Sequence, residues 1–391
     1  MTVIIDTPKL AEFCHRQTGA DYVTVDTEFI RDNTYWPQLC LIQISGPDAA
    51  AVVDPLAPGI DLSPVLALLA DRKILKVFHA ARQDVEIFYH LTGKIPEPIF
   101  DTQVAAMVCG FGEQASFENL AQKLAGTTID KSSRFTDWSH RPLSDRQIRY
   151  ALDDVVHLRP IYDRLERQLE KNGRASWLTE EMSVLTDPTT YRVDPADAWR
   201  RLKVRAGKPR FLAVLKEVAA WREEEAQRRD LPRNRLIRDE ALLEIAAHMP
   251  ASVEELGRMR GLSRGTAEGR VGQAILVTVQ RALARPESEW PRPEPKPELP
   301  SGLAPLIDLL RVLLKTKCEA EGVAQKLVAS AADLELIAAD DEAKVPALGG
   351  WRRTLFGEDA LALKHGALAL GVKGRRIALI PLKPRTRHAA D

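Results

Sequence analysis

The amino-acid sequence predicts an α/β domain followed by two all-α modules, and three observations support this fold class. Short β-branched runs alternate with helical patterns over residues 22–91. Helical patterns alone recur over 209–289 and 303–372, and the proline-rich run PESEWPRPEPKPELP separates them at 286–300. A chain of 391 residues is long enough for two or three domains that each bury a core.

The first domain is expected to span residues 1–190. Strands are predicted at the runs YVTVDTEF (22–29), CLIQIS (40–45), AAVVD (50–54) and ILKVFH (74–79), and helices at 63–70 and 81–91. Helical patterns then dominate from 102 to 169, so we expect an early sheet that later helices cover. Turn-forming residues at 186–195 mark the end of this domain.

The two helical modules are expected at 209–289 and 303–372, with a semi-rigid linker at 286–300 and a basic tail at 373–391. Shifting the last third of the chain by 91 residues aligns Leu212 with Leu303 and Leu243 with Leu334. This match, together with the shared order of helix, break and second helix, indicates a duplicated module.

Charge is distributed unevenly along a chain whose formal net charge is zero. Residues 1–190 carry 19 Lys and Arg against 27 Asp and Glu, 191–285 carry 20 against 13, and 286–391 carry 16 against 15. An acidic domain joined to a basic segment suits an enzyme that collects divalent cations in one place and a polyanion in another. Chance variation of solvated surface charge is the alternative.

Several classes of protein are disfavoured by the sequence. No apolar run approaches the roughly 20 residues of a membrane-spanning helix, and the first residues lack the pattern of a secretion signal. The four cysteines lie far apart, in neither zinc-ligand nor disulfide spacing. We therefore expect a cytoplasmic protein without a membrane partner, and no obligate protein partner is evident.

Five side chains form a pattern typical of a metal site. Asp26 and Glu28 lie at i and i+2, on the same face of a strand, where two carboxylates repel each other unless a cation lies between them. Asp84 follows the strand that ends near residue 78, and Tyr150 and Asp154 lie at i and i+4 on one helix face. Each motif alone has an ordinary structural explanation, such as a helix cap or a hydrogen-bonded pair. Their order along one chain is far more specific than any one of them.

The sequence resembles the DEDD exonucleases that carry a tyrosine in the third motif, and among them the ribonuclease D family. The resemblance covers nearly the whole chain and is carried by VDTEF (25–29), TYWPQLCLIQI (34–44), FHAARQDVEIF (78–88), DTQVAA (101–106), TDWSHRPL (136–143) and YALDDV (150–155). The resemblance implies a ribonuclease-H-like domain, with a mixed sheet flanked by helices. It further implies 3′→5′ hydrolysis of RNA to nucleoside 5′-monophosphates, with tRNA precursors that carry 3′ extensions as substrates.

Residue roles follow from the same resemblance. Asp26, Glu28, Asp84 and Asp154 match the metal ligands of the family, and Tyr150 matches the residue that positions the attacking water. Two divalent ions can both activate water and stabilise the leaving oxygen, and an all-carboxylate ligand set favours Mg²⁺ or Mn²⁺ over zinc.

The helical modules resemble HRDC nucleic-acid-binding domains. The first is carried by FLAVLKEVAAWREEEAQRRDLPRNRLIRDEAL, whereas the second matches mainly in position and has few basic residues in its opening helix. The second module is therefore expected either to contact RNA or to act as a brace.

Four further residues are candidates for substrate binding. Phe29 could stack on a terminal base or pack in the core, and His79 could touch substrate or be a structural histidine. Trp138 and Arg141 could line the RNA path, or the tryptophan could anchor its loop.

Two other functions remain open from the residues alone: a DNA 3′→5′ exonuclease of repair, and a non-catalytic nucleic-acid-binding scaffold. Contacts to the 2′-hydroxyl distinguish RNA from DNA, and no residue in the sequence indicates such a contact.

Overall fold

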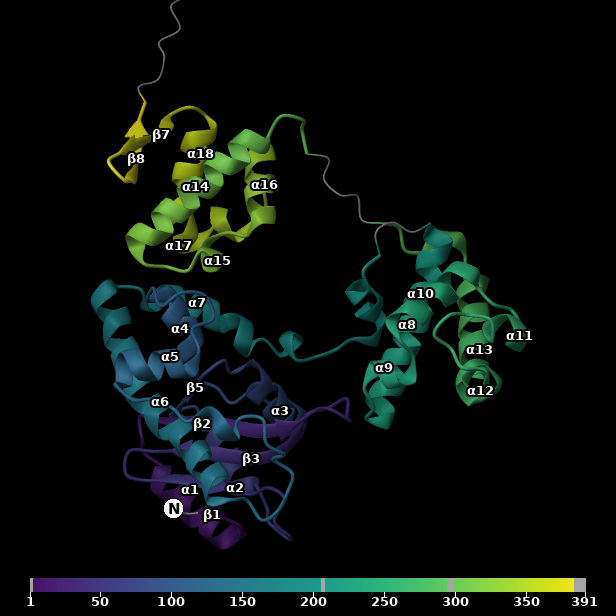
Figure 1. The fold of residues 1–391 in the computed structure, drawn as a ribbon, viewed down its shortest axis with the longest axis horizontal. Coiled ribbons are helices and arrows are strands. Elements are labelled where there is room, and N and C mark those ends of the chain that lie inside the picture. Colours follow the sequence, from purple (N-terminus) through teal and green to yellow (C-terminus); the bar gives the residue numbers. More distant parts are fainter. Residues whose placement is uncertain (1–2, 205–207, 294–298, 383–391) are drawn as a thin grey trace, which may run out of the picture.

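The computed structural model describes residues 3–204, 208–293 and 299–382. Within these ranges the elements form an N-terminal body with a sheet and two mainly helical bodies, coloured from purple to yellow along the chain (Figure 1). Each body buries its own set of apolar side chains. Among the described residues, none of the helices is both long and apolar enough to span a membrane.

The sheet of the N-terminal domain is mixed, and six strands form it in the described part of the chain. The strands are β1 (Val3–Ile4), β2 (Tyr22–Ile30), β3 (Gln38–Ser45), β4 (Ala50–Val53), β5 (Leu75–Phe78) and β6 (Ile99–Asp101). Their order is β1-β4-β3-β2-β5-β6, with β2, β3 and β4 antiparallel neighbours and the remaining pairs parallel. The two short strands β1 and β6 were not predicted, because two or three residues carry no readable alternation.

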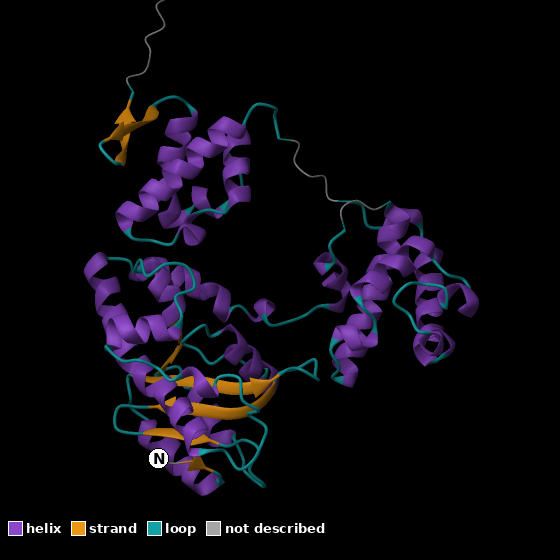
Figure 2. Cartoon of the chain, viewed as in Figure 1, coloured by secondary structure: helices purple, strands orange, loops and turns teal. Residues whose placement is uncertain are grey.

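Helices surround this sheet (Figure 2). They are α1 (Thr7–Gln17), α2 (Ser63–Ala70), α3 (Arg82–Thr92), α4 (Thr102–Val108), α5 (Phe117–Leu120), α6 (Asp145–Asn172) and α7 (Ala175–Thr186). The longest, α6, packs against β2, β3 and β4, so that its first turns lie beside the middle of the sheet. The mixed sheet flanked by helices agrees with the predicted fold class.

The first helical module docks on the N-terminal domain through the segment that follows β2. It consists of α8 (Pro209–Arg229), α9 (Arg233–Leu236), α10 (Asp239–His248), α11 (Val253–Leu256), α12 (Arg264–Glu268) and α13 (Arg270–Ala284). Tyr35, only 3% exposed, donates its hydroxyl hydrogen to Glu223 of α8, and Asp230 at the end of α8 accepts the backbone N–H groups of Tyr35 and Trp36 at 3.0 and 2.9 Å.

The second module begins with helices and ends in a β-hairpin. Its helices are α14 (Ala304–Glu321), α15 (Gln325–Val328), α16 (Ala331–Ala339), α17 (Gly350–Arg352) and α18 (Glu358–Lys364), and the antiparallel strands are β7 (Leu368–Lys373) and β8 (Arg376–Pro381). The sequence predicts only helices to 372 and then a basic tail, and the hairpin corrects that expectation. Gly374, at a φ of 65°, makes the tight turn that returns the chain.

Two predicted segments fall partly outside the described residues. The proline-rich linker at 286–300 includes 294–298, and the basic tail includes 383–391.

The second module rests on α4 and α7 of the N-terminal domain. The Ala324 N–H donates to the Met107 carbonyl at 3.0 Å, and Trp177 stacks on Trp351 with ring centroids 4.3 Å apart. Gly110 has a φ of 84°, and a Cβ there would lie 2.4 Å from the Gly322 carbonyl oxygen. A glycine is therefore required where the two backbones approach.

Candidate functional site

Strand β2 carries the first two acidic residues of the site. Val23 and Val25 are fully buried on one face of β2, and the alternation of a strand then directs Asp26 and Glu28 to the other face. The pairing of β2 with β3 shifts by one residue between Glu28 and Phe29. Such a bulge re-aims the side chains beside it, and bulges recur next to active sites.

Helix α6 supplies Tyr150 and Asp154 from its first turns. The helix starts at a capping box, in which Ser144 and Gln147 satisfy each other's backbone N–H groups. Further along, the Thr24 hydroxyl of β2 donates to the Val155 carbonyl at 2.7 Å. This bond ties the turn that carries Asp154 to the strand that carries Asp26.

Asp84 reaches the same region from α3. Its carboxylate accepts a hydrogen bond of 2.5 Å from the hydroxyl of Thr27, the residue between Asp26 and Glu28. The entry to α3 is fixed by Asp101, which accepts the N–H groups of Ala80 and Ala81 at 3.0 and 2.9 Å.

All five residues line one cavity of about 920 Å³. Carboxylate oxygens of Asp26, Glu28 and Asp154 lie within 4.8 Å of one another, and Asp84 lies beside them on the cavity wall. The structure therefore brings together residues from three elements, of which the first and the last are separated by more than a hundred positions in the sequence.

The electrostatics of this cavity fit a divalent cation. Burial, and then the neighbouring negative charges, raise the pKa of Asp26 well above its ordinary value and that of Glu28 to about 10. Burial is also the main cause that raises the pKa of Asp84 strongly and that of Asp154 to about 7. Carboxylates held this close need a positive partner to ionise together, and hard oxygen ligands suit a hard divalent ion.

Three of the four weaker candidates also line the cavity: Phe29, His79 and Trp138. The His79 ring nitrogen Nδ1 lies 3.0 Å from the Thr102 hydroxyl, and burial lowers the pKa of the imidazole. Trp138 is 3% exposed, with its ring centroid 6.0 Å from that of Tyr150. This tryptophan packs behind the tyrosine.

Arg141 does not line the cavity. Its guanidinium donates two hydrogen bonds to Asp54, both of 2.7 Å, and others to the carbonyls of Trp138 and Cys40 at 2.7 and 2.8 Å. The guanidinium fastens its own loop to β3 and β4, and the expectation that Arg141 borders the RNA path stays a prediction.

Sequence reasoning missed residues that support or line the site. Thr27 stands inside the DTE motif, and Asp101 precedes a helix as an N-cap, so local signals for both were present. Arg134 and Phe135 line the cavity as well. No periodicity or spacing marks this pair, because both lie in a connecting segment.

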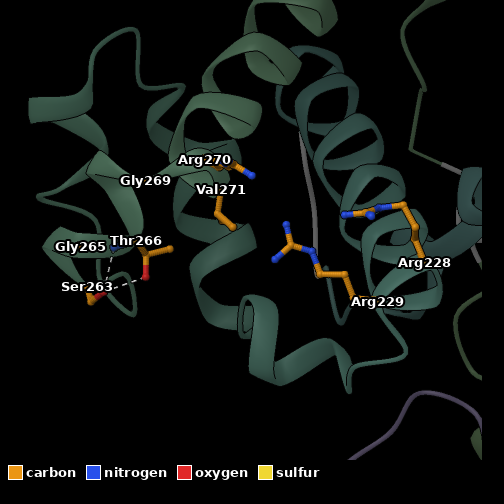
Figure 3. Close-up of a pocket in the computed structure, with 8 residues that line it drawn as sticks. All are labelled: Arg228, Arg229, Ser263, Gly265, Thr266, Gly269, Arg270 and Val271. Carbon is orange, nitrogen blue, oxygen red and sulfur yellow. Dashed lines mark hydrogen bonds between the residues drawn. The ribbon is translucent and has the colours of Figure 1, made fainter.

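A second cavity, of about 630 Å³, lies on the first helical module and is lined by arginines (Figure 3). Arg228 and Arg229 come from the end of α8, and Arg270 from the start of α13. Glu225 pairs with Arg228 and Arg229, so one carboxylate faces two of the three guanidinium groups and an excess of positive charge remains.

Comparisons with known proteins agree with this geometry. A family model described as 3′-5′ exonuclease matches residues 1–170, and the HRDC domain model matches 211–279. Ribonuclease D of Granulibacter bethesdensis is 52% identical over 382 residues, covering 97% of this chain and 96% of that protein. Ribonuclease D of Nitrobacter hamburgensis is 51% identical over 380 residues, covering 97% and 99%.

A solved structure extends the similarity to three dimensions. The crystal structure of Escherichia coli RNase D, described as an exoribonuclease involved in structured RNA processing, matches with a TM-score of 0.80 at 31% identity. The match covers 93% of this chain and 98% of that one. Similarity of this extent in both sequence and fold leaves one assignment: the chain belongs to the ribonuclease D family of metal-dependent 3′→5′ exoribonucleases.

Proposed function

We propose that Asp26, Glu28, Asp84 and Asp154 hold two divalent cations, Mg²⁺ or Mn²⁺, and that Tyr150 orients the water that attacks the 3′-terminal phosphodiester of RNA. The observation that carries this proposal is the approach of three carboxylates to within 4.8 Å in a cavity that also exposes Asp84 and Tyr150. The products are nucleoside 5′-monophosphates.

The donor set favours this choice of metal. Carboxylate oxygens are the preferred ligands of Mg²⁺ and Mn²⁺, whereas zinc sites draw on histidine and cysteine. When bound, the cations supply the charge that activates water and stabilises the departing 3′-oxygen.

Tyr150 acts through a hydrogen bond and does not remove a proton. Burial, followed by the negative charge of Asp154, raises the pKa of the Tyr150 hydroxyl, so the phenol stays protonated near neutral pH. The hydroxyl hydrogen is donated to Asp154, which leaves the phenol oxygen free to accept a hydrogen bond from water. A water held in this way directs its lone pair toward the phosphorus atom.

The substrates we propose are tRNA precursors with 3′ extensions. The arginine-lined cavity of the first helical module supports binding of the body of such an RNA, because guanidinium groups pair with phosphates regardless of sequence (Figure 3). No protein partner is needed for this scheme. The cytoplasmic location expected from the sequence stays a prediction.

Digestion of matched RNA and DNA strands, each labelled at the 5′ end, tests the proposal. We expect stepwise shortening of the RNA from the 3′ end with Mg²⁺ or Mn²⁺ and none with a chelator. Faster shortening of the DNA strand would favour a repair exonuclease instead. Binding without any shortening would favour a non-catalytic scaffold.

A further inference from the structure

A large apolar side chain stands in solvent at the catalytic cavity. Phe135 is 92% exposed, the highest fraction among the large apolar side chains of the described residues, and it lines the same cavity as the acidic cluster. Exposure to this degree contributes nothing to a core. The position of the ring beside the acidic residues therefore calls for a role in binding.

The segment that carries Phe135 is fastened on both sides. Ser133 is buried, and its carbonyl accepts the hydroxyl of Thr136 at 2.8 Å and the N–H of Thr136 at 3.2 Å. Gln147, in the first turn of α6, donates to the Thr136 hydroxyl at 3.2 Å. Residues 134 and 135 therefore project from an anchored turn next to the helix that carries Tyr150 and Asp154.

Arg134 places a positive charge next to this ring. Its guanidinium carbon lies 5.3 Å from the ring centroid of Phe135, within the range of a cation–π contact. In the part of the chain that the structure describes, the side chain of Arg134 is in no ion pair or hydrogen bond. The other arginine on the cavity wall, Arg31, donates hydrogen bonds of 3.1 and 2.9 Å to Glu86.

Charge and shape together indicate one kind of occupant. Without cations, the positive charge of Arg134 is attracted by the carboxylates of Glu28 and Asp154. Once cations neutralise these carboxylates, the guanidinium is available to pair with a phosphate. The guanidinium lies over the ring, and the high exposure of Phe135 leaves the rest of its surface open to a planar group. A nucleotide supplies both groups, a phosphate and a flat base.

We propose that Arg134 and Phe135 form a nucleotide clamp, in which Phe135 stacks on a base near the 3′ end of the RNA and Arg134 binds a phosphate of the same strand. This proposal rests on the proposed function, since it takes the acidic cluster as the place where the phosphodiester is cut. Stacking tolerates every base, so the clamp grips any sequence but requires that a base be present.

Replacing the ring tests the stacking half of the clamp. Phe135→Ala should raise KM for a single-stranded RNA by roughly 5- to 150-fold, the equivalent of one stacked base, with a smaller change in kcat. Phe135→Trp should retain wild-type KM. Because the side chain is exposed, the melting temperature should not fall. Val184→Ala, which removes another exposed apolar side chain (61% exposed), serves as the control and should leave KM unchanged.

An RNA that lacks one base shows whether the ring meets that base. An abasic site is placed in turn at each of the last three nucleotides of the RNA. At one of these positions it should weaken RNA binding by the wild-type protein, and at that same position it should not change RNA binding by Phe135→Ala. Additive losses at every position would overturn the stacking contact.

Neutral phosphate analogues test the arginine in the same way. One methylphosphonate at a linkage next to the scissile one should weaken binding by the wild type, and Arg134→Gln should lose that sensitivity. Arg72→Gln, which changes an exposed arginine outside the cavity, is the matched control. An arginine variant with unchanged KM and unchanged sensitivity would refute the phosphate contact.

Separate experiments test the clamp and the proposed function. Binding of the same RNAs by the Asp26→Asn protein, with Arg134 and Phe135 intact or changed, judges the clamp without turnover. Absence of cleavage by the wild type would count against the proposed function alone. Equal affinity of the clamp variants in the Asp26→Asn background would count against the clamp alone.

Discussion

In the metal-free protein, the carboxyl groups of Asp26, Glu28, Asp84 and Asp154 hold their protons more tightly than isolated carboxyls do. Burial disfavours the charged form of each group, and the neighbouring negative charges add to this effect at Asp26, Glu28 and Asp84. Ionisation of the cluster therefore costs folding free energy, and a bound cation offsets that cost.

Removing one ligand should abolish activity and spare the fold. We expect Asp26→Asn and Asp154→Asn each to reduce turnover by well over tenfold, since losing one good ligand costs more than about 1.4 kcal/mol of transition-state stabilisation. Rates at saturating Mg²⁺ are the measurement. A variant that kept more than about a tenth of wild-type activity would remove that residue from the metal site.

The same substitutions should change how stability depends on pH. The raised pKa of Asp154, about 7, means that the folded metal-free protein binds a proton that the unfolded chain releases near pH 4. The free energy of unfolding therefore decreases as pH rises from about 4 to about 7. Asp154→Asn should flatten this decrease, so without metal the variant should melt higher than wild type at pH 8 and similarly at pH 4. A melting temperature below wild type at pH 8 would contradict this account.

Substitutions of Tyr150 distinguish a role in orienting water from a role in packing alone. Tyr150→Phe keeps the ring beside Trp138 but loses the hydroxyl, so turnover should fall by roughly 10- to 10³-fold while RNA affinity hardly changes. Tyr150→His should recover part of the rate, because an imidazole nitrogen can accept from the same water. Single-turnover rates decide the question. A phenylalanine variant as fast as wild type would exclude Tyr150 from the reaction.

At the scale of elements, the segment after β2 joins the catalytic strand to the first helical module. The Tyr35 hydroxyl is surrounded by Glu223, Gln227 and Arg233 of that module, and Arg233 donates two hydrogen bonds of 2.5 Å to Glu223. From the same segment, Arg31 donates to the Tyr35 carbonyl at 3.1 Å and pairs with Glu86 on α3, the helix that carries Asp84. Docking of the module therefore braces two of the elements that hold the proposed metal ligands.

This interface should be sensitive to one carboxylate. Glu223 is 1% exposed, so Glu223→Ala leaves Arg233 and Tyr35 without their shared partner and should reduce stability by about 2–3 kcal/mol. Glu268→Ala breaks an exposed pair with Arg264 and should cost less than about 1 kcal/mol. Denaturant unfolding of both variants measures this difference. Equal losses of unfolding free energy would show that the buried network stabilises the protein no more than an exposed ion pair does.

At the scale of the whole molecule, we expect catalysis to reside in the acidic N-terminal domain and much of the RNA affinity in the basic first helical module. A chain that ends at Thr190 should bind long RNA more weakly than the full chain and with a shallower salt dependence, because phosphate contacts release counterions. The short chain should still cleave short RNAs, although it should be less stable because Tyr35 loses its cover. Affinities measured over a range of salt concentrations test this division.

A full-length variant tests the same division without the loss of stability that truncation brings. Arg229→Gln combined with Arg270→Gln removes two cations from the cavity on the first helical module, and the slope of log affinity against log salt should fall by about one per lost contact. An unchanged slope would mean that RNA affinity resides elsewhere.

The sequence by itself determined the parts of this protein that depend on nearby residues. Alternation placed Asp26 and Glu28 on one strand face, helical spacing placed Tyr150 and Asp154 together, and the motif order pointed to the correct family. Such features are readable because strand and helix periodicities involve residues two to four positions apart.

Only the tertiary structure decided which distant side chains meet. In the fold, Arg141 donates to Asp54, Thr27 donates to Asp84 and Tyr35 donates to Glu223. Phe135 lies exposed to solvent at the cavity that the acidic residues line. Contacts between residues far apart in the sequence depend on the path of the whole chain and leave no periodic trace in its local pattern. The sequence therefore identified the proposed metal ligands, whereas the side chains that surround and position them emerged only from the fold.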